Sequence, residues 1–243
     1  MNNDEKKLVE RLGEFITVEN IYDSNIKNVL EGEFSYNNRK IKAYIIGDNL
    51  HTEKKKFEGK IVGLIELKET DEERIVVVEK ENNYLNSYSQ ITGVFRDVEE
   101  LKHAKFKCLY ETSAGVVIYM VKNGEPYYLV TYSKKNFSGF PKGHVEYGET
   151  EETAAKREAL EEVGVNVELK PNFKSSISYT VFDTPIQKEV IFFLGEIKEN
   201  TKINIDINEI NKYEIVNYEQ AKFILNDELM NVLTEAKKYI ESI

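Results

Sequence analysis

The chain has 243 residues, with 43 acidic and 33 basic side chains and a formal net charge of −10 at pH 7. This acidic balance argues against general nucleic-acid binding, because basic surfaces hold phosphate backbones. A single cysteine, Cys108, excludes an intramolecular disulfide, and the length leaves room for two domains.

No apolar run approaches membrane-spanning length, and the N-terminus has no apolar core of the signal-peptide type. We therefore expect a cytoplasmic protein that does not use a membrane. Cys108 is expected to be a small, buried apolar residue.

The first hundred residues are rich in short β-branched runs. After a charged lead at residues 1–11, these runs predict strands at 15–19, 41–46, 60–67 and 74–80. Turn residues separate them at 37–38, 47–49 and 69–73. Residues 97–103 favour a short helix, and residues 102–108 a linker. Closely spaced short strands predict a small β-barrel or sandwich, which we assign to a domain over residues 1–108.

Parts of this region are similar to the barrel of soluble inorganic pyrophosphatases, namely residues 12–19 and 56–65. The acidic signature of those enzymes would fall near residues 37–43, where Arg39 and Lys42 stand instead. Because lysine and arginine do not hold metals, the resemblance implies a barrel without that catalysis. A generic β-domain used for packing, or for pairing two copies of the chain as a homodimer, explains the strands equally well.

Residues 109–243 alternate strands and helices, which predicts a second domain. A hairpin is expected over residues 114–131, because Asn123-Gly124 favours a tight turn. A loop over 133–147 follows. Further strands are expected at 165–169, 176–182 and 189–197, and helices at 219–225 and 228–240. The last helix repeats apolar residues at core spacing, namely Leu229, Leu233, Ala236 and Ile240. Helices on both sides of a mixed sheet give an αβα sandwich, so the fold class is α+β.

The most informative stretch runs from Gly143 to Val165 and reads GHVEYGETEETAAKREALEEVGV. A threonine can cap its helix and a glycine can end it. Glu158, Glu161 and Glu162 stand at i, i+3 and i+4, so their carboxylates share one helix face. The simpler interpretation of these glutamates is a solvated acidic face of a surface helix. Against it, the glutamates repel one another and lie near the negative end of the helix, where acidic side chains are unfavourable. A hard cation such as Mg²⁺ would relieve the conflict, which indicates function.

This stretch resembles the signature of the Nudix hydrolases at every specified position. In that family the helix binds Mg²⁺ or Mn²⁺, and the enzymes hydrolyse nucleoside diphosphates linked to another moiety. The resemblance implies that Glu158, Glu161 and Glu162 are the metal ligands, with the backbone carbonyl of Lys142 nearby. Metal ions at such a site neutralise phosphate charge and activate water.

Other residues receive supporting roles from the same resemblance. Arg157 and Glu149 would pair and hold the loop and helix together. Glu209 takes the place of a further glutamate that reaches the metals, so either Glu209 or Glu158 would accept the proton of the attacking water. The family usually has tryptophan where this chain has Ile215, which weakens the assignment of Glu209 and of the base pocket.

The flanks of the box resemble the branch that cleaves diadenosine tetraphosphate and similar dinucleoside polyphosphates. The resemblance over residues 140–146 implies that Lys142 and His144 contact substrate phosphates. The alternative is that Lys142 is an ordinary surface lysine and His144 an ordinary loop histidine, neither of which binds substrate. In that branch an aromatic residue at the position of Tyr179 stacks on the base, and a lysine near Lys188 meets phosphates. Tyr179 is equally well explained as an ordinary strand residue, since aromatic residues favour sheets.

We therefore expect a Mg²⁺-dependent hydrolase acting on a small nucleotide-type substrate, with dinucleoside polyphosphates favoured. Alternatives within the enzyme class are a nucleotide-pool cleaner, a sugar-nucleotide or cofactor pyrophosphatase, and an RNA 5′-end pyrophosphohydrolase. The acidic balance disfavours the RNA alternative. A nucleotide-sensing module without turnover is a different class, and the intact box argues against it. A third hypothesis makes the N-terminal barrel the partner-binding part and the hydrolase its effector.

Overall fold

The computed structural model describes residues 7–47, 50, 55–79, 85–135 and 137–243. The chain forms two compact units, each with its own hydrophobic core. One unit contains the chain up to Glu111 together with Glu146–Gly148 and Tyr179–Lys188. The other contains Thr112–Val145, Glu149–Ser178 and Glu189–Ile243.

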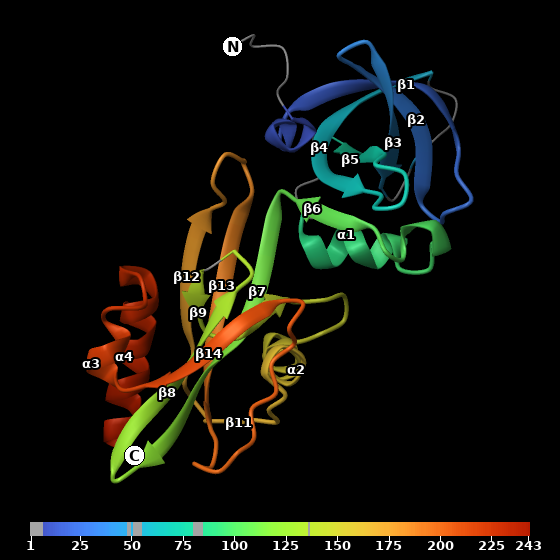
Figure 1. The fold of residues 1–243 in the computed structure, drawn as a ribbon. Coiled ribbons are helices and arrows are strands. Elements are labelled where there is room, and N and C mark those ends of the chain that lie inside the picture. The colour runs from blue at the N-terminus through green and yellow to red at the C-terminus, as the bar shows by residue number, and fades with distance from the viewer. Residues whose placement is uncertain (1–6, 48–49, 51–54, 80–84, 136) are drawn as a thin grey trace. The chain divides into compact units, whose positions relative to one another are not determined.

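The first unit contains a β-barrel (Figure 1). Its elements are η1 (Leu8–Arg11), β1 (Phe15–Asp23), β2 (Val29–Tyr36), β3 (Arg39–Ile46), β4 (Lys56–Glu66), β5 (Glu73–Glu79), α1 (Tyr88–Phe95), η2 (Glu99–Leu101) and β6 (Lys105–Cys108). The barrel strands follow the order β1-β2-β3-β5-β4, and β4 pairs with β1 to close the circle. The expected small barrel is thereby confirmed.

Strands β3, β4 and β5 bury both of their faces. Alternate residues such as Ile45, Ile61 and Val77 fill the barrel interior. Their sequence neighbours, for example Ile46 and Val62, pack outside the barrel in a second core that includes residues of α1 and η2. A strand covered on both faces reads as a continuous apolar run, which is the pattern of β4 and β5.

One expectation for this region is wrong. Residues 102–108 are not a linker, because Lys105–Cys108 form β6 and pair with β4. The short helix expected at 97–103 is present as the 3-10 helix η2, which covers only Glu99–Leu101. The turn at 37–38 is present, with positive φ angles of 47° and 57° at Asn37 and Asn38. The charged lead and the turn at 47–49 lie partly outside the described residues.

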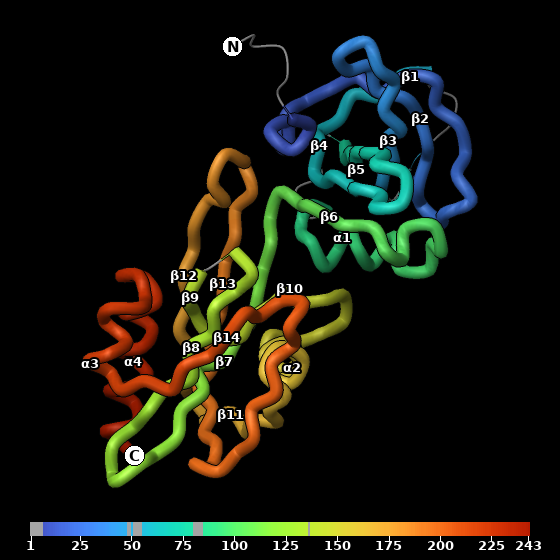
Figure 2. Tube along the Cα trace, in the orientation of Figure 1, coloured from blue at the N-terminus to red at the C-terminus, as the bar shows by residue number. Residues whose placement is uncertain are grey.

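The remaining elements form a sheet with helices on both faces, as Figure 2 also shows. They are β7 (Tyr110–Lys122), β8 (Glu125–Ser133), β9 (Ser138–Gly139), β10 (Lys142–His144), α2 (Glu151–Val163), β11 (Glu168–Leu169), β12 (Ser175–Thr180), β13 (Gln187–Glu196), β14 (Ile210–Val216), α3 (Tyr218–Ala221) and α4 (Asp227–Ser242). The central order is β11-β13-β7-β8-β14, with β12 on β13, β10 on β7 and β9 on β8.

Helix α2 covers one face of this sheet, and α3 and α4 cover the other (Figure 1). Helix α2 contributes the small residues Ala154, Ala155 and Ala159 to a core that also contains Val116 and Ile118 of β7. Such short side chains let the helix approach the sheet closely. The αβα sandwich and the α+β class are confirmed.

Several boundaries in this region differ from expectation. The strand expected at 165–169 is only Glu168–Leu169, and the helix expected at 219–225 covers only Tyr218–Ala221. Strand β14 was not predicted. In the described part of the chain, no helix is long and apolar enough to cross a membrane.

Candidate functional site

Helix α2 is framed at both ends by the residues that its sequence provides. The Thr150 hydroxyl accepts a hydrogen bond from the Thr153 N–H at 3.2 Å. Gly164 ends the helix with a φ of 69°, and its N–H donates to the Leu160 carbonyl at 3.0 Å. The predicted helix is confirmed, and no basic residue in its last turn offsets the acidic side chains there.

Arg157 connects the helix to the preceding loop. Its Nε and Nη2 donate to both oxygens of Glu149, at 2.8 and 2.9 Å. Nη2 also donates to the His144 carbonyl at 2.9 Å, while Nη1 donates to Glu158 at 2.7 Å and Glu161 at 2.9 Å. These bonds, with Glu149 foremost, raise the pKa of Arg157, so the guanidinium is a fixed positive centre.

Glu158 lies in contact with the backbone of the loop. The residue is buried, and a Cβ atom on Gly143 would lie only 2.1–2.4 Å from atoms of its carboxylate. Only glycine therefore leaves room for the carboxylate at this point. Burial raises the pKa of Glu158, with Glu161 and Glu209 adding to the shift and Arg157 opposing it.

Glu162 belongs to the same cluster and is half-buried. Its Oε2 accepts a hydrogen bond from the Lys142 N–H at 3.2 Å. Burial raises the pKa of Glu162 to about 8, with contributions from the charges of Glu158 and Glu209 and opposition from Lys142. The buried Glu158 and the half-buried Glu162 therefore lie close to a third carboxylate without enough positive charge around them to compensate all three.

The donor set suits a hard divalent cation, because such ions take carboxylate and carbonyl oxygens. Among the described residues, however, no set of three His, Cys, Asp or Glu side chains is arranged to hold a metal. In this structure Arg157 Nη1 forms ion pairs with one carboxylate oxygen of Glu158 and one of Glu161, and these oxygens are therefore directed toward the guanidinium. The Glu161 side chain is 59% exposed, so it can exchange this partner for a metal with little loss of burial.

Glu209 lies close enough to act on the same cluster. It directly precedes β14 and is exposed, and its N–H donates to the Asp206 carbonyl at 3.1 Å. The Asp206 N–H in turn donates to the Glu162 carbonyl at 3.0 Å. These two backbone hydrogen bonds connect the turn at Glu209 to the end of α2. The negative charge of Glu209 contributes to the raised pKa values of Glu158 and Glu162.

The other residues with predicted roles have varied surroundings. Lys142 and His144 are half-buried in β10, which pairs with β7. Tyr179 and Lys188 belong to the barrel-containing unit. There the Lys188 Nζ lies 3.4 Å from Oε2 of the buried Glu111. The roles of these four residues in substrate binding stay predictions.

One exposed aromatic residue was not singled out from the sequence. The Phe137 side chain is 72% exposed in the loop after β8, and the Lys134 N–H of that loop donates to the Glu209 carbonyl at 3.0 Å. The sequence signal for Phe137 is an aromatic residue within a polar loop. Such residues are candidates for nucleotide binding, because exposed rings can stack on bases.

The metal-free protein is expected to lose stability as pH rises from about 5 to 8. The pKa of Glu162 is near 8 in the folded state against an ordinary value of 4.5, so the folded state binds more protons in this interval. The free energy of unfolding should therefore be highest below about pH 4.5 and stop falling above about pH 8 as far as this group is concerned. Melting temperatures in chelator, compared with Glu162→Gln, test this; equal pH slopes in both proteins would contradict it.

Comparison with known proteins identifies the family. Residues 109–236 match the NUDIX domain family. An RNA pyrophosphohydrolase from a Sulfurovum species is 33% identical in an alignment of 117 residues that covers 44% of this chain and 69% of that protein. A bis(5′-nucleosyl)-tetraphosphatase (asymmetrical) from Sus scrofa is 37% identical in an alignment of 62 residues that covers 24% of this chain and 41% of that protein.

A solved structure shows the same fold. The Ap4A hydrolase of C. elegans, in a binary complex, superposes with a TM-score of 0.51 at 22% identity, covering 55% of this chain and 99% of that one. The family match covers more than half of the sequence and includes the whole box. The chain therefore belongs to the Nudix family of hydrolases, as the box predicts.

Proposed function

We propose that the chain is a Mg²⁺-dependent enzyme, with Mn²⁺ as a substitute, that hydrolyses a phosphoanhydride bond of a nucleoside polyphosphate. The observation that carries this proposal is the group of three carboxylates on one face of α2, in which Glu158 is buried, Glu162 is half-buried with its pKa raised to about 8, and Glu161 is exposed. A divalent ion bound there would supply charge neutralisation of the phosphates and a water of lowered pKa.

The residues of the chain divide the remaining work. Glu158, Glu161, Glu162 and the Lys142 carbonyl would hold the ion. Arg157 and Glu149 are proposed to keep the loop against the helix, which their paired hydrogen bonds support.

Proton transfer and charge stabilisation fall to residues around that cluster. Glu209 or Glu158 would accept the proton of the attacking water, and a raised carboxyl pKa, as burial gives Glu158, suits that role. Lys142, His144 and Lys188 would offset charge on the phosphate chain, and Tyr179 would stack on a base.

Two substrate classes are supported by different observations. The sequence around the box favours dinucleoside polyphosphates, and the relative from Sus scrofa carries a matching name. RNA with a 5′-triphosphate is the second candidate, because the Sulfurovum relative matches over a larger share of its length. The acidic net charge by itself disfavours an RNA substrate, and the similarity to the Sulfurovum protein is the observation that favours one.

The two classes are separated by comparing kcat/KM for diadenosine tetraphosphate, a 5′-triphosphorylated oligoribonucleotide, nucleoside triphosphates and ADP-ribose. We expect one of the first two to exceed the simple nucleotides by at least about tenfold, because a second recognised base or nucleotide adds about 1–3 kcal/mol. Tyr179→Ala should reduce that preference and spare the simple nucleotides. A wild-type preference for ADP-ribose or nucleoside triphosphates would contradict both substrate classes and leave the hydrolase proposal standing.

The barrel domain over residues 1–108 is proposed to be non-catalytic, with the hydrolase domain over residues 109–243. A cytoplasmic location and a homodimer stay predictions. A sensing module without turnover is less well supported, because every ligand position of the box is intact.

A further inference from the structure

Tyr147 lies in the loop between β10 and α2 and contacts helix α1. The segment Glu146–Gly148 belongs to the same compact unit as α1. A Cβ atom on Gly93 of α1 would lie 2.2 Å from Cδ2 of the Tyr147 ring and 2.7 Å from its Cγ and Cε2. The ring therefore rests against the backbone of the helix at a position that has no side chain.

The residues of α1 fit this contact. Gly93 lies inside a helix of eight residues, where glycine is the least favourable residue after proline. Its φ angle is not positive, so the helix does not require glycine there, and what Gly93 provides is room for the ring. Arg96, directly after the helix, adds a cation–π contact, because its guanidinium carbon lies 5.1 Å from the centroid of the Tyr147 ring.

Helix α1 is a firm support for the ring. Ile91 and Phe95 are buried in the core outside the barrel, which also contains residues of β3, β4 and β5. Ser87 and Gln90 form the capping box at the start of the helix. The Tyr147 residue, in contrast, is 56% exposed and belongs to a loop. The contact therefore restrains the loop more than it restrains the helix.

The same loop connects to the carboxylate cluster two residues after Tyr147. Glu149 accepts hydrogen bonds from Nε and Nη2 of Arg157, at 2.8 and 2.9 Å. Nη1 of that guanidinium donates to Glu158 at 2.7 Å and to Glu161 at 2.9 Å. A shift of the loop at Tyr147 is therefore transmitted through Glu149 and Arg157 to two of the three glutamates.

We propose that Tyr147 is a positioning residue of the hydrolase, whose contact with Gly93 and Arg96 makes α1 a determinant of turnover. Tyr147 acts through Arg157, which sets the carboxylate orientations of Glu158 and Glu161, and small displacements of such groups lower the rate of a reaction. This inference rests on the proposed hydrolysis at α2 and gives helix α1 a part in it.

The test compares kcat at saturating Mg²⁺, with whichever of diadenosine tetraphosphate and the 5′-triphosphorylated oligoribonucleotide the wild type hydrolyses faster. Tyr147→Ala and Gly93→Ala should each lower kcat about tenfold and leave KM and Mn²⁺ affinity within about twofold, because the proposed ligand side chains lie on α2. The double variant should also lose only about tenfold, since both changes remove one contact. Tyr147→Phe keeps the ring on Gly93 and should turn over as wild type.

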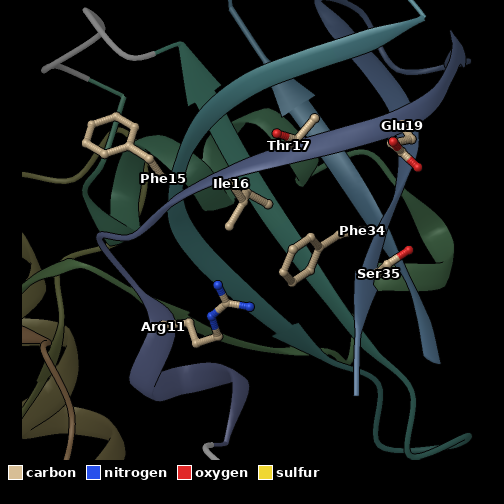
Figure 3. Close-up of a pocket in the computed structure, with 7 residues that line it drawn as sticks. All are labelled: Arg11, Phe15, Ile16, Thr17, Glu19, Phe34 and Ser35. Atoms are coloured by element: carbon tan, nitrogen blue, oxygen red, sulfur yellow. The ribbon is translucent and has the colours of Figure 1, made fainter. Parts of the chain in front are cut away.

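Phe15→Ala is the matched control. Phe15 belongs to the same unit, lines a pocket beside β1 and β2 (Figure 3) and is 56% exposed, as Tyr147 is. Its loss should leave kcat unchanged. A second readout needs no turnover, namely the Nε–H resonance of Arg157 in the isotope-labelled, metal-free chain. This resonance should shift in Tyr147→Ala and Gly93→Ala and stay in place in Tyr147→Phe and Phe15→Ala.

Wild-type kcat in both alanine variants would overturn the positioning role, and so would losses that multiply to about a hundredfold in the double variant. If Gly93→Ala unfolds, the comparison of Tyr147→Ala with Tyr147→Phe decides, and equal kcat in these two would overturn the role. If the wild type hydrolyses neither substrate, the proposed function fails while the Arg157 resonance still decides the contact. An unchanged resonance in Tyr147→Ala would then overturn the positioning of Arg157 by Tyr147, and a shift would support it.

Discussion

Replacement of Glu162 by glutamine is expected to lower kcat by at least about a hundredfold, because it removes a ligand charge from the metal that would stabilise the reacting phosphate, and such a stabilising contact is worth about 3 kcal/mol or more. The free energy of unfolding should stay the same or rise. Burial already disfavours the charge on this side chain, and glutamine can still accept the hydrogen bond from the Lys142 N–H. Steady-state kinetics with saturating Mg²⁺, together with thermal melting, measure both effects.

Glu152→Gln is the matched control for this change. Glu152 is an exposed glutamate in the first turn of the same helix and is not among the proposed ligands. Its loss should leave kcat within about twofold and slightly weaken the helix, since an acid favours the N-terminal end. Near-normal kcat in Glu162→Gln would remove this residue from the metal site.

Gly143→Ala is expected to reduce kcat/KM by about a hundredfold without unfolding the protein. The added Cβ would lie 2.1–2.4 Å from the Glu158 carboxylate, so that flexible side chain must move away. The backbone need not shift, and no positive φ is required at this glycine. A displacement of about 1 Å in a catalytic group can reduce the rate by that factor.

Gly139→Ala serves as the comparison. Its Cβ would meet only the Leu229 side chain at 3.5 Å, an ordinary contact, so rate and stability should change little. Equal kinetics for the two alanine variants would show that the position of the Glu158 carboxylate does not matter for turnover.

The frame of α2 could be predicted because its determinants are local. Capping by Thr150, termination at Gly164 and the i, i+3, i+4 spacing of the glutamates all lie within one short segment. The proximity of Glu209 depends instead on a turn held by backbone hydrogen bonds to the end of the helix. Spacing along the sequence contains no signal for such tertiary contacts, so only a family resemblance pointed to this residue.

Strand β2 escaped prediction because charged residues interrupt its apolar pattern. Leu30 and Phe34 are buried while Glu31 and Glu33 point outward, which is a period of two. The acids are tolerated because lysines of β3 pair with them, Lys42 with Glu31 at 2.7 Å and Lys40 with Glu33 at 2.5 Å. Lys42, which stands where a pyrophosphatase would have its acidic signature, therefore serves as a cross-strand partner.

The helix α1 was missed for a different reason. Its start has a capping box, in which Ser87 and Gln90 satisfy each other's backbone groups, but the helix is only eight residues long. Its buried residues, Ile91 and Phe95, are too few to establish a helical period by themselves. Packing against the outer face of the barrel stabilises it.

The proposed activity depends most directly on a divalent ion at the three glutamates of α2. Electron paramagnetic resonance of free Mn²⁺, titrated into the chain, measures this binding without reference to any substrate. We expect wild type and Glu152→Gln to remove Mn²⁺ from solution equally, and Glu161→Gln and Glu162→Gln to bind it at least about tenfold more weakly, because each loses a ligand charge. Equal Mn²⁺ binding by wild type and both ligand variants would contradict the proposed metal centre.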